Sequence, residues 1–62
     1  MKSAVAVREA ARQKGPFWLR NSKGAHRVTT VHRVNGRLFH VLCEDGCWFA
    51  VDPNYTLFRS PS

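Results

Sequence analysis

Hydrophobic and polar positions alternate most regularly between residues 28 and 51, a pattern that predicts two β-hairpins sharing a middle strand. The first turn contains Asn35-Gly36, a pair typical of a two-residue type I′ turn, because both central residues of that turn need a positive φ. The second turn contains Glu44-Asp45-Gly46, which suits a three-residue turn ending in a glycine bulge. We therefore expect strands over about 25–34, 37–43 and 47–51.

These two turns also predict which residues face each other across the strands. The first turn places Val28 opposite Cys43, and the second places Cys43 opposite Cys47. One face is then expected to form the core and carries Val28, Thr30, Val34, Phe39, Val41, Cys43, Cys47, Phe49 and Val51. The outer face carries Arg27, Thr29, Val31, Arg33, Leu38, His40, Leu42, Trp48 and Ala50.

The segments on either side of the hairpins are shorter. Helix formers between Ser3, a fair N-cap, and the Gly15-Pro16 stop predict a helix over residues 3–14. Short apolar runs predict strands at 17–20 and 55–58, so that residues 17–58 form the β part of the chain. Residues 59–62 predict a frayed tail. With 62 residues, the chain predicts a single domain, residues 1–62.

Five short strands joined by tight turns predict a mainly β fold: a small five-stranded antiparallel SH3-like barrel, a meander preceded by one short N-terminal α-helix. The alternative is an α+β fold in which the helix packs on one face of an antiparallel sheet. Two arrangements compete for the apolar part of the outer face, Leu38, Leu42 and Trp48. The helix covers this patch in one, and the patch is exposed in the other.

Charge narrows the choice of partner. Ten Lys and Arg residues against four Asp and Glu residues give a formal net charge of +6, which favours a polyanion or an acidic protein surface. Nine of the ten basic residues lie in residues 1–42, where Glu9 is the one acidic residue. The other acidic residues are Glu44, Asp45 and Asp52, so we expect an acidic end near the second turn.

We therefore expect a non-enzymatic nucleic-acid-binding domain, for DNA or RNA, that uses an Arg- and Lys-rich, Trp-containing outer face of the sheet. Arginine suits this role because its planar fork matches phosphates and base edges, and tryptophan can stack on bases. No helix-turn-helix, zinc-finger or RNP pattern is present, so the signal is electrostatic. The candidate contact residues are Lys23, Arg27, Arg33, Arg37, Trp48, Trp18, Arg8 and Arg12.

A protein-binding role is the alternative. A small compact chain with an apolar patch can act as an adaptor or an inhibitor, as phage- or plasmid-type accessory proteins do, and dock on a larger nucleic-acid-handling partner. Its positive charge would then face an acidic groove. The candidate docking residues are Leu38, His40, Leu42 and Trp48.

Reactive side chains are few and scattered. Cys43 and Cys47 face each other across the second turn, and we expect a reduced pair in a cytosolic chain. A zinc site with histidine ligands is disfavoured, because the expected faces separate the three histidines and the Cys-x₃-Cys spacing is not that of a zinc knuckle. Glu9 is the one carboxylate outside residues 44–52, so no acid/base pair is evident, and no Gly-rich phosphate loop is present. We therefore expect no enzyme, no metal and no cofactor.

The hydropathy pattern also bears on location. No apolar run approaches the ~18 residues of a membrane span, and Arg8 and Glu9 interrupt the N-terminal apolar run after four residues. We expect a cytoplasmic protein without membrane contact. We further expect a monomer or a weak homodimer, because an exposed edge strand can pair two copies.

Overall fold

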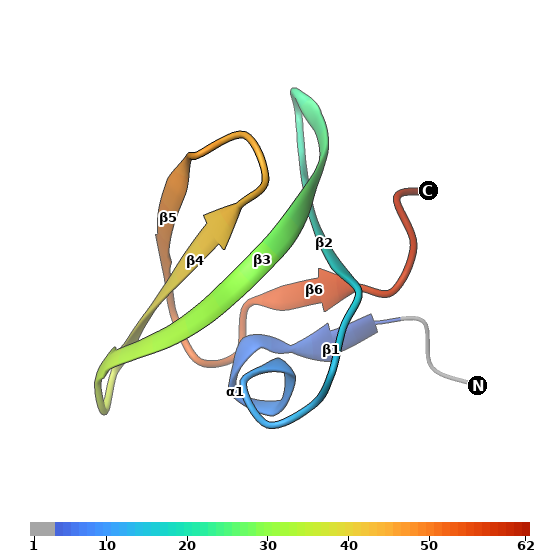
Figure 1. Ribbon diagram of the computed structural model, residues 1–62. Helices are drawn as coiled ribbons and strands as arrows, with labels where there is room; N and C mark the ends of the chain where they lie inside the picture. The colour runs from blue at the N-terminus through green and yellow to red at the C-terminus, as the bar shows by residue number, and fades with distance from the viewer. Residues whose placement is uncertain (1–3) are drawn as a thin grey trace.

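The computed structural model describes residues 4–62 as six antiparallel strands in one open sheet, with one short helix (Figure 1). The strand order is β1-β6-β2-β3-β4-β5, so β2 to β5 form a meander and β6 returns beside β2. The fold is therefore mainly β, as predicted, with six strands instead of five. The elements are β1 (Ala4–Ala6), α1 (Val7–Ala10), β2 (Phe17–Asn21), β3 (Gly24–Asn35), β4 (Leu38–Cys43), β5 (Trp48–Val51) and β6 (Thr56–Phe58).

The core lies on one side of the curled sheet and receives side chains from α1 and from β2 to β6. Leu19, Leu57 and Val41 are among its most deeply buried side chains. Their burial removes apolar surface from water, which is the main favourable term in folding. The buried residues are Val7, Ala10, Phe17, Leu19, Val28, Phe39, Val41, Cys43, Val51 and Leu57.

The predicted helix over residues 3–14 is wrong in its extent. Ala4–Ala6 forms β1 and pairs with β6, with Ala4 opposite Phe58, and only Val7–Ala10 is helical. Ser3, the expected N-cap, lies outside the described residues, and Ala6 precedes the helix without a side-chain cap. A short helix is marginal in water, whereas β1 gains hydrogen bonds along β6 and packs Val5 against the core. Tertiary contacts therefore override the helix propensity of this segment.

The second hairpin has the predicted form. Val41 lies opposite Phe49 and Phe39 lies opposite Val51, as the three-residue turn requires. Gly46 has a φ of +89°, and the Cys43 N–H donates to the Cys47 carbonyl at 2.9 Å. A residue other than glycine is strained at this φ, so the Glu44-Asp45-Gly46 sequence determines this turn.

The first hairpin turns one residue later than predicted. Asn35 lies opposite Leu38, so Gly36 and Arg37 are the turn residues. Gly36 does not have a positive φ, and the predicted type I′ turn over Asn35-Gly36 is therefore wrong. The Asn35 side chain instead accepts a hydrogen bond from the Arg37 N–H at 2.9 Å, a local bond typical of Asn in turns.

Irregular pairing in β3 changes which of its residues face the core. The register shifts between Val28 and Thr30, and beyond this point Val31 lies opposite Val41 and Arg33 lies opposite Phe39. One extra residue in a strand moves all later side chains to the opposite face. The predicted faces are therefore wrong for the part of β3 beyond Val28: Val31 packs against the core and Arg33 shares its face, whereas Thr30 and Val34 are exposed. Cys47, also predicted for the core face, is exposed, whereas Phe39, Val41, Cys43, Phe49 and Val51 lie in or against the core as predicted.

The short helix does not cover the apolar patch on the outer face. Val7 and Ala10 place α1 against the core. Leu38, His40 and Leu42 alternate along β4 with the buried residues Phe39, Val41 and Cys43, and therefore point to the opposite face. Of the two arrangements predicted for this patch, the structure has the one without a covering helix: Trp48 is exposed, and Leu38 and Leu42 are half-buried.

The C-terminal residues 59–62 form no strand or helix, as expected, but their side chains contact the sheet. The Arg20 guanidinium stacks on the Phe58 ring at 3.8 Å and donates to the Ser60 carbonyl at 3.0 Å. Arg59 lies over the Phe17 ring and donates to Gln13. Two arginines thus join residues 59 and 60 to the body of the domain, and fraying of the tail stays a prediction.

Candidate phosphate-binding site

Three arginines from two distant parts of the chain line one hollow between α1, the β3–β4 turn and the turn before β6. The hollow has a volume of about 410 Å³. We call it the arginine hollow, and its lining residues are Arg8, Ala11, Arg12, Arg33, Gly36, Phe39 and Pro53. Its rim is cationic, and Ala11, Phe39 and Pro53 supply an apolar part.

Backbone hydrogen bonds place Arg8 and Arg12 on this rim. The Val7 N–H donates to the Tyr55 carbonyl at 2.8 Å and the Arg8 N–H donates to the Pro53 carbonyl at 3.2 Å, which ties the start of α1 to the turn before β6. The Ala11 N–H then donates to the Val7 carbonyl at 3.0 Å, so the helical turn continues past Ala10. Residues four apart on a helical turn lie on the same side, and Arg8 and Arg12 therefore face the hollow together.

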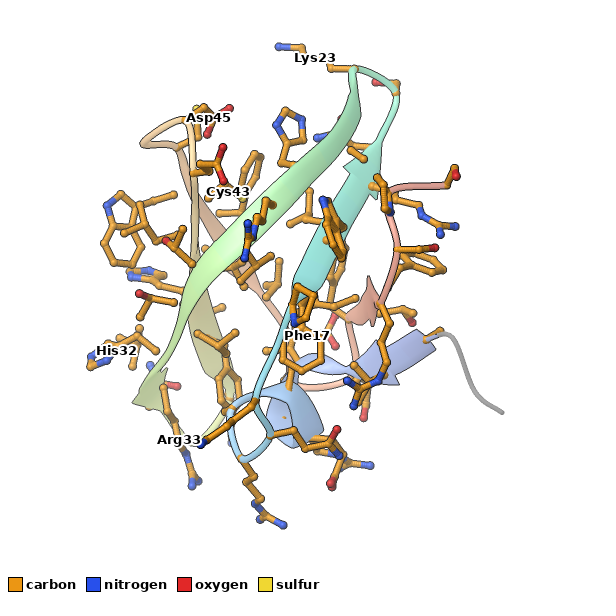
Figure 2. All side chains as sticks on the ribbon, turned by 45° about the vertical axis from the view of Figure 1, so that its right-hand side comes forward. Phe17, Lys23, His32, Arg33, Cys43 and Asp45 are labelled. Atoms are coloured by element: carbon orange, nitrogen blue, oxygen red, sulfur yellow. The ribbon has the colours of Figure 1, made fainter. Side chains whose placement is uncertain are left out.

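Arg33 reaches the hollow because of the irregular pairing in β3. It lies opposite Phe39, on the core face of the sheet and near the end of the strand. Figure 2 shows Arg33 at this end of β3, beside α1. In the regular register predicted from the sequence, Arg33 would point to the outer face and away from Arg8 and Arg12.

The positive charge of the hollow is poorly balanced within the domain. Among residues 4–62, no acidic side chain lines it. Glu9 pairs with Arg12 only at 4.0 Å, with the two side chains 48% and 78% exposed, and an ion pair of this kind contributes little. Asp52 lies next to Pro53 and accepts a hydrogen bond from the Asn54 N–H. An anion in the hollow would offset the mutual repulsion of the three guanidinium groups.

The other predicted basic residues do not join this hollow. Lys23 lies in the turn after β2, at the end of the sheet opposite Arg33 (Figure 2). Arg37 is exposed in the β3–β4 turn and does not line the hollow. Arg27 lies opposite Trp18 on neighbouring strands, with Glu44 at 4.0 Å from its guanidinium. The single basic outer face expected from the sequence is thus divided among separate parts of the molecule.

Trp48 lies on the outer face of the edge strand β5. It is 56% exposed and lies opposite Leu42. The His40 ring meets it nearly edge-on, with 5.9 Å between ring centroids. The four residues predicted for protein binding, Leu38, His40, Leu42 and Trp48, therefore lie together on one face of β4 and β5, on a different face from the arginine hollow.

A second group of polar side chains surrounds the β4–β5 turn. Asp45 accepts a hydrogen bond from the Cys47 N–H, which lowers the pKa of its carboxyl group, and it lies 3.2 Å from Nδ1 of His26. Burial raises the pKa of the Cys43 thiol. The negative charge of Asp45 raises the pKa of the exposed Cys47 thiol. Both cysteines are free in this structure, and neither has the low pKa of a nucleophilic thiol.

This arrangement predicts unequal reaction of the two thiols with iodoacetamide at pH 8. Cys47 should react in the native protein, whereas Cys43, which is 2% exposed, should react at least about a hundredfold more slowly because the domain must open first. Replacing Asp45→Asn should lower the pKa of Cys47, increase its thiolate fraction and speed its modification. Mass spectrometry of the labelled peptides gives both rates. Equal labelling in native protein, or a Cys47 rate unchanged by Asp45→Asn, would contradict this prediction.

Two further observations concern the described part of the chain. Within residues 4–62, no group of three or more His, Cys, Asp or Glu side chains could hold a metal ion. No helix in this part is long and apolar enough to cross a membrane.

Comparisons with protein-family models, with curated proteins and with solved structures find no match to this chain. Sequence reasoning identified each of the three arginines of the hollow but not their convergence. The spacing of Arg8 and Arg12 was the one local signal. No sequence pattern predicted the register shift in β3 that brings Arg33 to the hollow.

Proposed function

We propose that this chain is a non-enzymatic nucleic-acid-binding domain that contacts phosphate through the arginine hollow. The observation that supports this most strongly is the convergence of Arg8, Arg12 and Arg33 on one hollow without an acidic lining residue among residues 4–62. A guanidinium group presents donors in a fixed fork that matches phosphate oxygens. The net charge of +6 adds long-range attraction toward any nucleic acid.

Fluorescence anisotropy with labelled duplex DNA, single-stranded DNA and RNA across a salt series tests this function. We expect micromolar or tighter binding at low salt and a linear decrease of log K with log salt. On duplex DNA the slope should be about 0.9 for each phosphate contacted. Absence of binding to all three probes at the lowest salt concentration of the series would contradict the proposal.

We also propose that the curled sheet is a small SH3-like barrel. The consecutive pairing of β2 to β5 and the return of β6 beside β2 support this assignment. A closed barrel leaves few free strand edges, which a small β domain otherwise has to protect. Backbone contacts between β1 and β5 in an NMR structure would establish closure. Two fully solvent-exposed edges in that structure would contradict it.

A protein-binding adaptor or inhibitor is the second candidate function, and the exposure of Trp48 beside His40 and Leu42 favours it. An exposed tryptophan is a common anchor in protein interfaces, and the +6 charge suits a partner with an acidic surface. An identified partner that binds the native chain and Arg33→Ala, but not Trp48→Ala, would support this function. A partner that binds Trp48→Ala as well as the native chain would contradict it.

A further inference from the structure

The size and lining of the arginine hollow indicate a ligand smaller than a nucleic-acid duplex. Its volume of about 410 Å³ is within the range of small-molecule pockets, about 300–1,000 Å³. We propose that the hollow binds a single nucleotide that carries a phosphomonoester, either at the end of a nucleic-acid strand or as a free mononucleotide. This inference deepens the proposed function and rests on it for the strand-end source.

Charge favours a phosphomonoester over an internal phosphodiester. A phosphate monoester carries about −1.5 to −2 charges at pH 7, whereas a diester within a strand carries a single negative charge. Three guanidinium groups line the hollow, and the one ion pair that any of them forms with residues 4–62 is the 4.0 Å contact of Arg12 with Glu9. A dianion therefore balances this group of charges better than a diester does.

Three parts of the chain border the hollow. Phe39 belongs to the core and is almost fully buried, so it closes the hollow toward the interior of the domain. The helical turn carrying Arg8 and Arg12 borders one side, and Arg33 and Gly36 border another. An internal nucleotide has to enter and leave with a strand on both sides, whereas a terminal nucleotide needs one opening.

The apolar lining adds a reason to expect a nucleotide and not a simple anion. Ala11, Phe39 and Pro53 line the same hollow as the arginines. Apolar surface of this kind gains from contact with a sugar or a base, and inorganic phosphate offers no such contact. The ligand should therefore combine a dianionic group with an apolar or aromatic part, as a nucleoside monophosphate does.

The test compares one labelled single-stranded oligonucleotide in three forms, with a 5′-phosphate, a 3′-phosphate or two hydroxyl ends. We expect at least one phosphorylated form to bind the full chain at least tenfold more tightly than the hydroxyl form. Adenosine monophosphate should displace this phosphorylated oligonucleotide at a lower concentration than inorganic phosphate does. Arg33→Ala should remove the difference between the forms. Arg37→Ala, which changes the charge equally in the neighbouring turn outside the hollow, should keep it.

Arg33→Lys is a second variant, which keeps the positive charge but lacks the planar guanidinium group. It should reduce the difference in affinity between the phosphorylated and hydroxyl oligonucleotides. Circular dichroism shows whether each variant is folded. If the native chain binds all three forms equally and Arg33→Ala weakens this binding, this inference is overturned and the proposed function stands. Binding of adenosine monophosphate without binding of any oligonucleotide would support the inference and overturn the proposed function. Displacement by inorganic phosphate as readily as by adenosine monophosphate would overturn the nucleotide assignment.

Discussion

Replacing Leu57→Ala should lower the free energy of unfolding by about 2–5 kcal/mol. Leu57 is fully buried in the short strand β6, between β1 and β2. Truncation of a buried leucine to alanine costs about 2–5 kcal/mol, because transfer free energy is lost and a cavity remains. Domains are stabilised by about 0.05–0.15 kcal/mol per residue, which is about 3–9 kcal/mol for a chain of this length. One substitution therefore removes a large share of the stability.

Urea denaturation followed by tryptophan fluorescence measures this loss. Thr56→Ala is the matched control, because Thr56 is the exposed neighbour of Leu57 on the same strand. It should change the free energy of unfolding by no more than about 0.5 kcal/mol. A loss below about 1 kcal/mol for Leu57→Ala would show that β6 is not packed into the core as described.

The double substitution Arg8→Ala with Arg33→Ala should lower the affinity for nucleic acid by about a hundredfold at low salt. Each arginine is expected to form a charge-assisted hydrogen bond to phosphate worth about 1.5 kcal/mol or more, and tenfold in affinity corresponds to about 1.4 kcal/mol. Removing two phosphate contacts should also reduce the salt slope by about two. The anisotropy titration at several salt concentrations gives both quantities.

The charge-matched control is Lys23→Ala with Arg37→Ala. It removes the same two positive charges from exposed positions outside the arginine hollow. We expect a loss of less than about tenfold, because these residues contribute to long-range attraction and not to the site. If both double variants lose affinity equally, the binding is diffuse and the hollow is not the site.

Several features of the fold follow from interactions between residues that are close in the sequence. Glycine at position 46 and two acidic turn residues before it determine the β4–β5 turn, since its backbone conformation suits glycine. Period-two alternation along 38–43 correctly separates Phe39, Val41 and Cys43 from the outward-facing residues of β4. These features could be read from the sequence because each depends on neighbouring residues.

The N-terminal segment adopts a structure that local sequence preferences do not predict. Ala4–Ala6 has good helix propensity, yet it pairs with Thr56–Phe58, 50 to 54 positions away in the chain. Strand pairing with β6 and packing of Val5 against the core stabilise this segment through contacts with residues far away in the sequence. Helix propensity describes only the local preference of each residue and does not include these contacts. The order of β1, β6 and β2 in the sheet was inaccessible for the same reason.

In the candidate site, too, some properties follow from the sequence alone and others only from the tertiary structure. Composition by itself established a basic chain of 62 residues with arginines suited to phosphate, and the turn chemistry established a mainly β domain. Only the tertiary structure decided which arginines meet. A one-residue shift near Thr29 turns Arg33 to the core face, and the pairing of 4–6 with β6 brings Arg8 and Arg12 beside it. Both depend on contacts between distant segments, whose free energies are not encoded in any local pattern of residues.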